Sequence, residues 1–165
     1  MRIVILGCAG SGKTTLAKRL AAKTGAPLIC LDDLSSTGGV TPDQVPAFRK
    51  LIDKLHAGEA WISDGNFAAA TFDIRLPRAD LIVWLEPPRW RCTWRSIARV
   101  FRPAEPHRPG RLWRVLMFIR NFDRVNRPRI EALRAEHGPH VPVVRLRSSG
   151  EIAAFAPATT PPAGR

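Results

Sequence analysis

The residues with the clearest potential chemistry lie close to the start of the chain. Residues 7–14 read Gly-Cys-Ala-Gly-Ser-Gly-Lys-Thr, which satisfies the pattern G-x-x-x-x-G-K-[ST]. Small residues in such a loop let backbone N–H groups close around a phosphate, and Lys13 can reach its β- and γ-oxygens. The Thr14 hydroxyl can ligate Mg²⁺. The segment therefore predicts a site for a nucleoside triphosphate with magnesium.

A phosphate loop needs a buried strand before it and a helix after it, and the flanking sequence offers both. Residues 2–6 form a continuous apolar run that stops at glycine, as in a strand buried on both faces. Residues 13–23 carry the apolar stripe of a helix, whose positive N-terminal end would point at the bound anion. The alternative, a chance match in a glycine-containing turn, does not explain this context.

Carboxylates follow two further predicted strands, residues 27–31 and 60–63. Asp64 precedes a glycine, so its side chain should project from the carboxyl edge of the sheet, where ligands of open α/β sheets bind. There it could hold the magnesium shell, or it could be a turn or N-cap residue. Asp32 and Asp33 could accept a proton from an acceptor hydroxyl or bind magnesium through water. Their alternative is a solvated turn pair.

The remaining pattern alternates strands with helices. We expect helices over residues 41–56, 88–101 and from 112 onward, with a kink or restart near Asn126. Further strands are expected at 81–85 and 141–146, and a last helical turn at 151–155. The fold class is therefore α/β, three layers around a five-stranded parallel sheet. Its 165 residues predict one domain over 1–155 and a disordered tail over 156–165.

Positive charge is concentrated in one part of the chain. Lys and Arg number 26 against 14 Asp and Glu, and residues 89–134 hold thirteen arginines against three acids. This excess favours an anionic partner: a nucleotide, nucleic acid, a phosphorylated metabolite or an acidic membrane surface. Arginine forks suit bidentate phosphate contacts, although a genome-wide base-composition bias would also favour Arg over Lys.

Arginines recur along one face of the predicted 88–101 helix. Arg91, Arg95 and Arg99 are spaced by four residues, and such a row repels itself unless it faces an anion such as a triphosphate. Trp90 and Trp94 lie between them and could pack into the core or stack on a base, with core packing the favoured interpretation.

Cysteines and apolar runs bear on the cellular compartment. Cys8, Cys30 and Cys92 are far apart and form no C-x-x-C pair, which argues against a disulfide framework or a zinc site. The apolar run at the N-terminus is too short for a signal peptide or a membrane span. We expect a cytoplasmic protein with free thiols, no membrane partner and surface histidines.

The chain resembles the P-loop small-molecule kinases of adenylate and shikimate kinase type. The resemblance rests on the phosphate loop, Leu31-Asp32-Asp33, Trp61-Ile-Ser-Asp-Gly-Asn66 and Leu85-Glu-Pro-Pro followed by spaced arginines. It is nearest to the bacterial adenylate kinase-related "DNA topology modulation" proteins, a closeness suggested by the Trp-x-x-Asp-Gly-Asn stretch. It implies the P-loop NTP hydrolase fold, ATP and Mg²⁺ as cofactors, and a short Arg-rich helical lid over about residues 89–127.

The resemblance also implies roles for individual residues. Asp32 would orient or deprotonate the acceptor hydroxyl, Arg95 would lie near the base or phosphates, and Arg99 would contact the transferring phosphoryl. Adenylate kinases read Asp-Gly-Phe-Pro-Arg at the similar strand end, where the arginine helps hold the monophosphate. Here the sequence is Asp64-Gly65-Asn66-Phe67, so acceptance of AMP is not implied.

The expected site has four overlapping parts. The catalytic residues are Lys13, Asp32, Arg95 and Arg99. The nucleotide is bound by Gly7, Cys8, Ala9, Gly10, Ser11, Gly12, Lys13, Thr14, Thr15 and Arg95. The acceptor is bound by Asp33, Asp64, Asn66, Arg120 and Arg127, and the metal by Thr14 and Asp64. For Arg120 and Arg127 the alternative is a solvated or acid-paired helix face.

The predicted function is transfer of the ATP γ-phosphate to a small acceptor: a nucleotide, a nucleoside or a hydroxylated metabolite. Two alternatives stay open. One is a nucleotide-regulated nucleic-acid-binding protein, in which the Arg-rich segment contacts phosphate backbones. The other is a simple NTPase.

Overall fold

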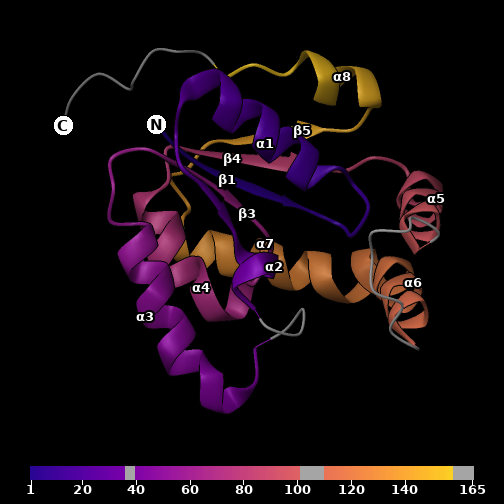
Figure 1. The fold of residues 1–165 in the computed structure, drawn as a ribbon, viewed down its shortest axis with the longest axis horizontal. Coiled ribbons are helices and arrows are strands. Elements are labelled where there is room, and N and C mark those ends of the chain that lie inside the picture. The colour runs from indigo at the N-terminus through magenta and orange to yellow at the C-terminus, as the bar shows by residue number, and fades with distance from the viewer. Residues whose placement is uncertain (36–39, 101–109, 158–165) are drawn as a thin grey trace.

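A parallel sheet of five strands forms the centre of the molecule, as expected (Figure 1). The computed structural model describes residues 1–35, 40–100 and 110–157. The strands are β1 (Arg2–Gly7), β2 (Leu28–Cys30), β3 (Trp61–Asp64), β4 (Leu81–Leu85) and β5 (Val143–Leu146). Their order is β2-β3-β1-β4-β5, which places the strand that precedes the phosphate loop in the middle. The predicted fold class is confirmed.

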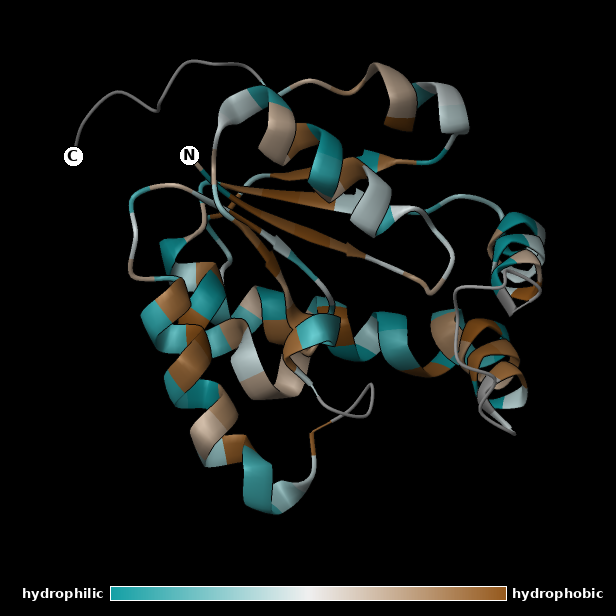
Figure 2. Ribbon diagram, in the orientation of Figure 1, coloured by the Kyte–Doolittle hydropathy of each residue, from teal (hydrophilic) through white to brown (hydrophobic). Residues whose placement is uncertain are grey.

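Helices cover both faces of the sheet (Figure 1). One face carries α1 (Lys13–Thr24) and α8 (Ser149–Ala154), and the other carries α3 (Val45–Leu55), α4 (Ala68–Arg75) and α7 (Arg127–His137). Alternate residues of β1 enter the two cores: Ile3 and Ile5 pack toward α1, while Val4 and Leu6 pack with the opposite layer. This double burial explains the unbroken apolar run at the start of the chain, and Figure 2 shows the strands as mainly apolar.

The Arg-rich segment forms two helices at one end of the sheet. Helix α5 (Arg89–Val100) packs against α6 (Arg111–Asn121), and a π-helical segment, η3 (Phe122–Asn126), joins α6 to α7. Pro128 lies at the start of α7, where a missing N–H costs no helical hydrogen bond, so the expected restart near Asn126 is confirmed. Residues 101–109, which include the expected end of the 88–101 helix, lie outside the described residues, as does 158–165 of the expected tail.

Several boundaries differ from expectation by a few residues. Strand β2 ends at Cys30, and residues Leu31–Leu34 form the single turn α2, so Asp32 and Asp33 begin a helix rather than close a strand. Helix α3 is preceded by a 3₁₀ turn, η1 (Pro42–Gln44), and a second one, η2 (Leu76–Arg78), follows α4. No helix in the described parts of the chain is both long and apolar enough to span a membrane.

The expectation that the histidines lie at the surface is wrong for His56. Its ring is 1% exposed, stands edge-on to Trp61, and bonds at both nitrogens, to Ile52 O at 2.7 Å and Ser63 Oγ at 2.9 Å. Because a carbonyl only accepts, Nδ1 carries the proton, and Ser63 donates to Nε2. Burial lowers the pKa of His56 to about 4, so the ring is neutral at pH 7.

Candidate active site

The phosphate loop closes tightly between β1 and α1. Gly10 and Gly12 have φ angles of 73° and 100°, which glycine adopts without strain. A Cβ at Gly10 would come within 2.3 Å of the Cys92 carbonyl oxygen, so α5 lies directly against the loop. Lys13 Nζ donates to the carbonyls of Gly7 at 3.0 Å and Cys8 at 2.9 Å, which holds the ammonium inside the loop. The Lys13 ammonium and the N-terminal end of α1 thus give the loop a positive character suited to a phosphate.

Thr14 and Asp64 meet beside this loop. The parallel register pairs Ile5 with Asp64, which places the carboxylate at the carboxyl edge of the sheet. Thr14 Oγ1 donates to Asp64 Oδ2 at 2.6 Å, while Asp64 Oδ1 is buried without a hydrogen-bond partner among the described residues. Burial raises the pKa of Asp64, and the Lys13 charge and the Thr14 hydroxyl oppose that rise. A hydroxyl and an unpartnered carboxylate oxygen are donors that fit Mg²⁺.

Asn66 contacts the phosphate loop instead of pointing to an acceptor. Its Nδ2 donates to Gly7 O at 2.9 Å, and Gly7 N donates to its Oδ1 at 3.1 Å. This reciprocal pair engages both the oxygen and the nitrogen of the amide, and the assignment of Asn66 to acceptor binding stays a prediction. The side chain fixes the first residue of the loop to the end of β3.

One arginine of the row on α5 contacts the phosphate loop. Arg95 Nη1 donates to Ser11 O at 3.3 Å, whereas Arg91 Nη1 donates to Ser149 Oγ at 2.8 Å and joins α5 to α8. Arg99 is exposed one turn beyond Arg95. The structure therefore brings Arg95 to the loop and places Arg99 one turn further along α5, in an exposed position.

Asp32 and Asp33 lie at the same edge of the sheet as Asp64. Strand β2 pairs Cys30 with Asp64, and α2 begins at the next residue. Both carboxylates are exposed, and their negative charge contributes to the raised pKa of Asp64. Their position suits a group that meets an acceptor next to the phosphate loop.

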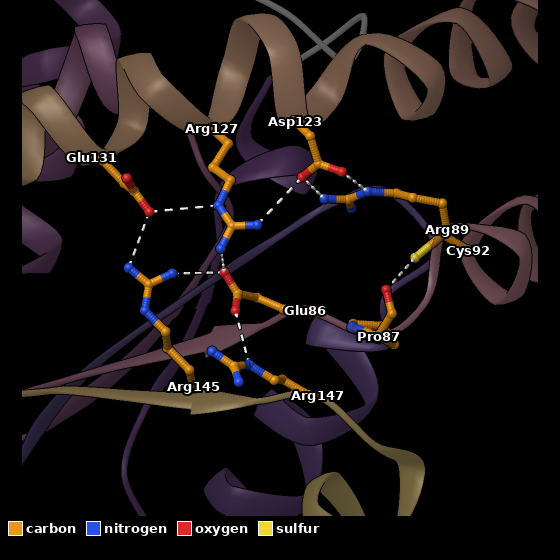
Figure 3. A network of polar contacts seen from close by, with 9 residues as sticks. All are labelled: Glu86, Pro87, Arg89, Cys92, Asp123, Arg127, Glu131, Arg145 and Arg147. Carbon is orange, nitrogen blue, oxygen red and sulfur yellow. Dashed lines mark hydrogen bonds and ion pairs between the residues drawn. The ribbon is translucent and has the colours of Figure 1, made fainter.

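Arg127 is held by acidic residues, and its predicted role in binding the acceptor stays a prediction. Its guanidinium contacts Glu86, lies 3.5 Å from Asp123 Oδ1 and 3.5 Å from Glu131 Oε1 (Figure 3). The alternative of an acid-paired helix face describes it correctly. Arg120 is exposed on α6, with its side chain in solvent.

The same acids tie three other arginines into one network. The Glu86 carboxylate, 8% exposed, also accepts from Arg145 at 2.7 Å and lies 3.6 Å from Arg147. Arg89 donates to Asp123, and this hydrogen bond lowers the pKa of that carboxyl (Figure 3). The network fixes η3 and the start of α5 to the ends of β4 and β5.

Sequence reasoning missed two features next to the phosphate loop. Cys8 and Cys92 are both buried and free, and the interaction between the two thiols lowers the pKa of Cys92 and raises that of Cys8. Arg75 is fully buried and donates to the carbonyls of Gly65 and Asn66. The spacing from Thr71 to Arg75, four residues on the helix after Asn66, was the available signal.

The tryptophans of the Arg-rich helices lie at the surface. Trp90, Trp94 and Trp113 are 66%, 68% and 65% exposed, so the favoured core packing of Trp90 and Trp94 is wrong. On α5 they occupy the face opposite Cys92, which packs against the loop. No role in the buried core explains them.

Solved structures of similar shape are small-molecule kinases. The shikimate kinase of Acinetobacter baumannii, in complex with shikimate, has a TM-score of 0.58 and 18% identity, covering 92% of this chain and 87% of that one. The shikimate kinase of Bacteroides thetaiotaomicron has a TM-score of 0.58 and 20% identity, and the match covers 93% of this chain and 93% of that one. A gluconokinase of Sinorhizobium meliloti 1021 has a TM-score of 0.56 and 18% identity, and the match covers 92% of this chain and 85% of that one. No protein-family model matches this chain, and neither does any curated sequence. The chain shares the fold of these P-loop small-molecule kinases.

Proposed function

We propose that the protein is an ATP-dependent phosphotransferase that moves the γ-phosphate to a hydroxyl of a small metabolite. The observation that carries this proposal is the contact between Thr14 and Asp64 beside a loop that already encloses the Lys13 ammonium. A triphosphate in the loop would bring its terminal phosphates between these groups. Magnesium bound by Thr14 and Asp64 would supply charge neutralisation at the β- and γ-oxygens.

Each remaining charged group has a place in the reaction. Lys13 and Arg95 lie at the loop and stabilise negative charge on the phosphates, and Arg99 reaches the transferring phosphoryl when α5 closes over it. Asp32 accepts the proton of the acceptor hydroxyl, and Asp33 orients the acceptor. Both lie at the sheet edge beside Asp64. Exclusion of water by the Arg-rich helices limits hydrolysis of ATP.

The acceptor is a hydroxylated metabolite rather than a nucleoside monophosphate. Asn66 is turned to Gly7, and the Pro-Arg that holds a monophosphate in adenylate kinases has no counterpart after Gly65. The similar solved structures are kinases named for shikimate and gluconate, which are small hydroxylated acids. This likeness supports the choice of acceptor class.

The test is magnesium-dependent release of ADP, scanned over hydroxylated metabolites, nucleosides and nucleoside monophosphates, with Lys13→Ala as the blank. Acceleration by a hydroxylated metabolite supports the proposal. Acceleration by AMP alone would overturn the acceptor class. Release of ADP that no acceptor changes would identify a simple NTPase.

The exposed tryptophans favour a second candidate, binding of single-stranded nucleic acid. Trp90, Trp94 and Trp113 lie among arginines on α5 and α6, and exposed aromatics with arginines suit stacked bases and phosphates. The resemblance to the DNA topology modulation proteins, which rests on the Trp-x-x-Asp-Gly-Asn stretch, also favours this second candidate. Titration with a single-stranded oligonucleotide at several salt concentrations tests it. Affinity that falls steeply with salt and is lost in Trp90→Ala/Trp94→Ala, but kept in Lys13→Ala, would support it.

A further inference from the structure

Arg75 is a fully buried arginine whose charge has no carboxylate in contact among the described residues. Its Nε donates to Thr71 Oγ1 at 2.9 Å, and Nη1 donates to Ser63 Oγ at 3.0 Å. The other contacts are backbone carbonyls, Gly65 O at 3.1 Å from Nη1 and Asn66 O at 2.5 Å from Nη2. Burial lowers the pKa of Arg75 to about 9, and it stays charged at pH 7. A cation is seldom buried in this way unless its hydrogen bonds are needed.

The two carbonyls belong to a segment with an unusual backbone. Gly65 has a φ of 129° and Phe67 one of 34°, and a Cβ at Gly65 would lie 3.1 Å from that of Leu31. These conformations turn the peptide oxygens of residues 65 and 66 toward α4, where Arg75 receives them. Without donors from Arg75, both oxygens would lose these hydrogen bonds, and the segment would change its course.

The same segment carries the groups that meet the phosphate loop. Asp64 precedes Gly65 and accepts from Thr14, and the Asn66 amide pairs with both backbone groups of Gly7. Contacts therefore run from the Arg75 guanidinium through the Asn66 backbone to the Asn66 amide, and from there to the first residue of the loop.

The contacts on the far side of Arg75 give it a fixed position. Ser63 Oγ donates to the neutral Nε2 of His56 and accepts from Arg75, so its hydroxyl proton has one orientation. Thr71 Oγ1 donates to Phe67 O at 2.9 Å and accepts from Arg75 Nε. The guanidinium is thus anchored to α3 through His56 and Ser63, and to its own helix through Thr71.

We propose that Arg75 is a positioning residue for nucleotide binding, which acts by holding the Gly65 and Asn66 carbonyls so that Asp64 and Asn66 meet Thr14 and Gly7. This inference rests on the proposed function, because it assumes that the phosphate loop binds MgATP. It makes no use of the acceptor or of turnover, because the groups that it places touch the triphosphate half of the site.

The test is a double-mutant cycle on MgATP affinity, measured by calorimetry with Arg75→Lys, Asn66→Ala and the double variant. Lysine keeps the charge but cannot reproduce the four contacts of the planar fork. We expect Asn66→Ala to weaken binding about 10-fold and Arg75→Lys about 10- to 100-fold. The double variant should bind no more weakly than Arg75→Lys, because both changes break one chain of contacts. Effects that multiply in the double variant would overturn the inference.

Two further variants make the experiment decisive. Arg78→Lys is the matched control, because Arg78 lies three residues further on and contacts Asp53 at the surface, so its affinity should stay within about twofold of the parent. Thr71→Val removes one partner of the guanidinium, and we expect about 2- to 5-fold weaker binding. If Arg75→Lys does not fold, Thr71→Val decides, and an unchanged affinity in that variant would overturn the inference.

The outcomes separate this inference from the proposed function. A parent protein that binds MgATP but phosphorylates no acceptor would contradict the proposed function and leave the cycle on Arg75 fully interpretable. If Arg75→Lys is folded and binds MgATP with the same affinity as the parent protein, the inference is overturned and the proposed function is not affected. A purely structural Arg75 would lower the unfolding temperature without coupling to Asn66.

Discussion

Lys13, Asp64 and Arg75 lie buried or half-buried at the phosphate loop or behind it, whereas many arginines of α5 to α7 lie at the surface or against acids. Lys13, Asp64 and Arg75 are bonded to carbonyls and hydroxyls, and Lys13 and Asp64 stand where a ligand in the loop could meet their charge. Arg127 and Arg145 share Glu86 and Glu131, which neutralise them. The comparison teaches that the local density of arginine says less about function than the partners of each one.

The largest expected effect is that of Lys13→Ala on nucleotide binding. Loss of the ammonium inside the loop should weaken ATP affinity by about 100-fold or more, because a charge-assisted contact to the phosphates is removed. Calorimetric titration measures it, with Lys18→Ala on the exposed side of α1 as the control. Unchanged ATP affinity in Lys13→Ala would contradict the assignment of the phosphate loop to ATP binding.

Arg99→Ala tests the exposed arginine of α5 that lies one turn beyond Arg95. We expect turnover to fall about 100-fold with less than about a fivefold change in ATP affinity, because the contact should form chiefly in the transition state. Steady-state kinetics with the acceptor found in the scan checks this, and Arg114→Ala, exposed on α6, is the control. Equal losses in turnover and affinity would make Arg99 an ordinary binding residue.

His56 gives the buried region a dependence on pH that the surface arginines lack. Its pKa is about 4 in the folded protein against an ordinary 6.5, so the unfolded chain binds more protons between these values. Stability is therefore complete above pH 6.5 and falls as the pH drops toward 4, by roughly 2–4 kcal/mol. Urea unfolding at pH 7 and pH 4.5 measures it, and His56→Gln should flatten this part of the profile. A profile that the substitution leaves unchanged would contradict the assignment.

Glu86→Gln tests whether the ion-pair network is structural. The amide removes the negative charge shared by Arg127, Arg145 and Arg147, and we expect a loss of about 1–3 kcal/mol in unfolding free energy. ATP affinity should change less than about threefold, because the partners of Glu86 among the described residues do not contact the phosphate loop. Glu136→Gln, exposed on α7, is the control. A large loss of affinity at unchanged stability would place the network in the binding site.

The sequence predicted the parts of the site that depend on neighbours along the chain. The loop residues, Lys13 and Thr14 follow from a local pattern, and the apolar run of β1 together with the stripe of α1 was enough to place them. The order of the elements likewise predicted the parallel sheet. These features needed no knowledge of distant contacts.

The roles of other residues depend on which distant segments meet. Asn66 pairs with Gly7 across 59 residues, and Arg127 meets Glu86 across 41, so no spacing indicated either contact. Arg75 was overlooked because arginine is rarely buried, and His56 because its partner Ser63 lies on another element. These contacts arise from tertiary packing.

The most direct test of the central claim is to follow the γ-phosphate itself. Phosphorus NMR of the protein with ATP, Mg²⁺ and a hydroxylated acceptor should show loss of the γ-resonance and growth of a phosphate monoester on that acceptor, with neither change in Lys13→Ala. Growth of inorganic phosphate alone, or an ATP spectrum that stays unchanged with every acceptor tried, would contradict phosphotransfer.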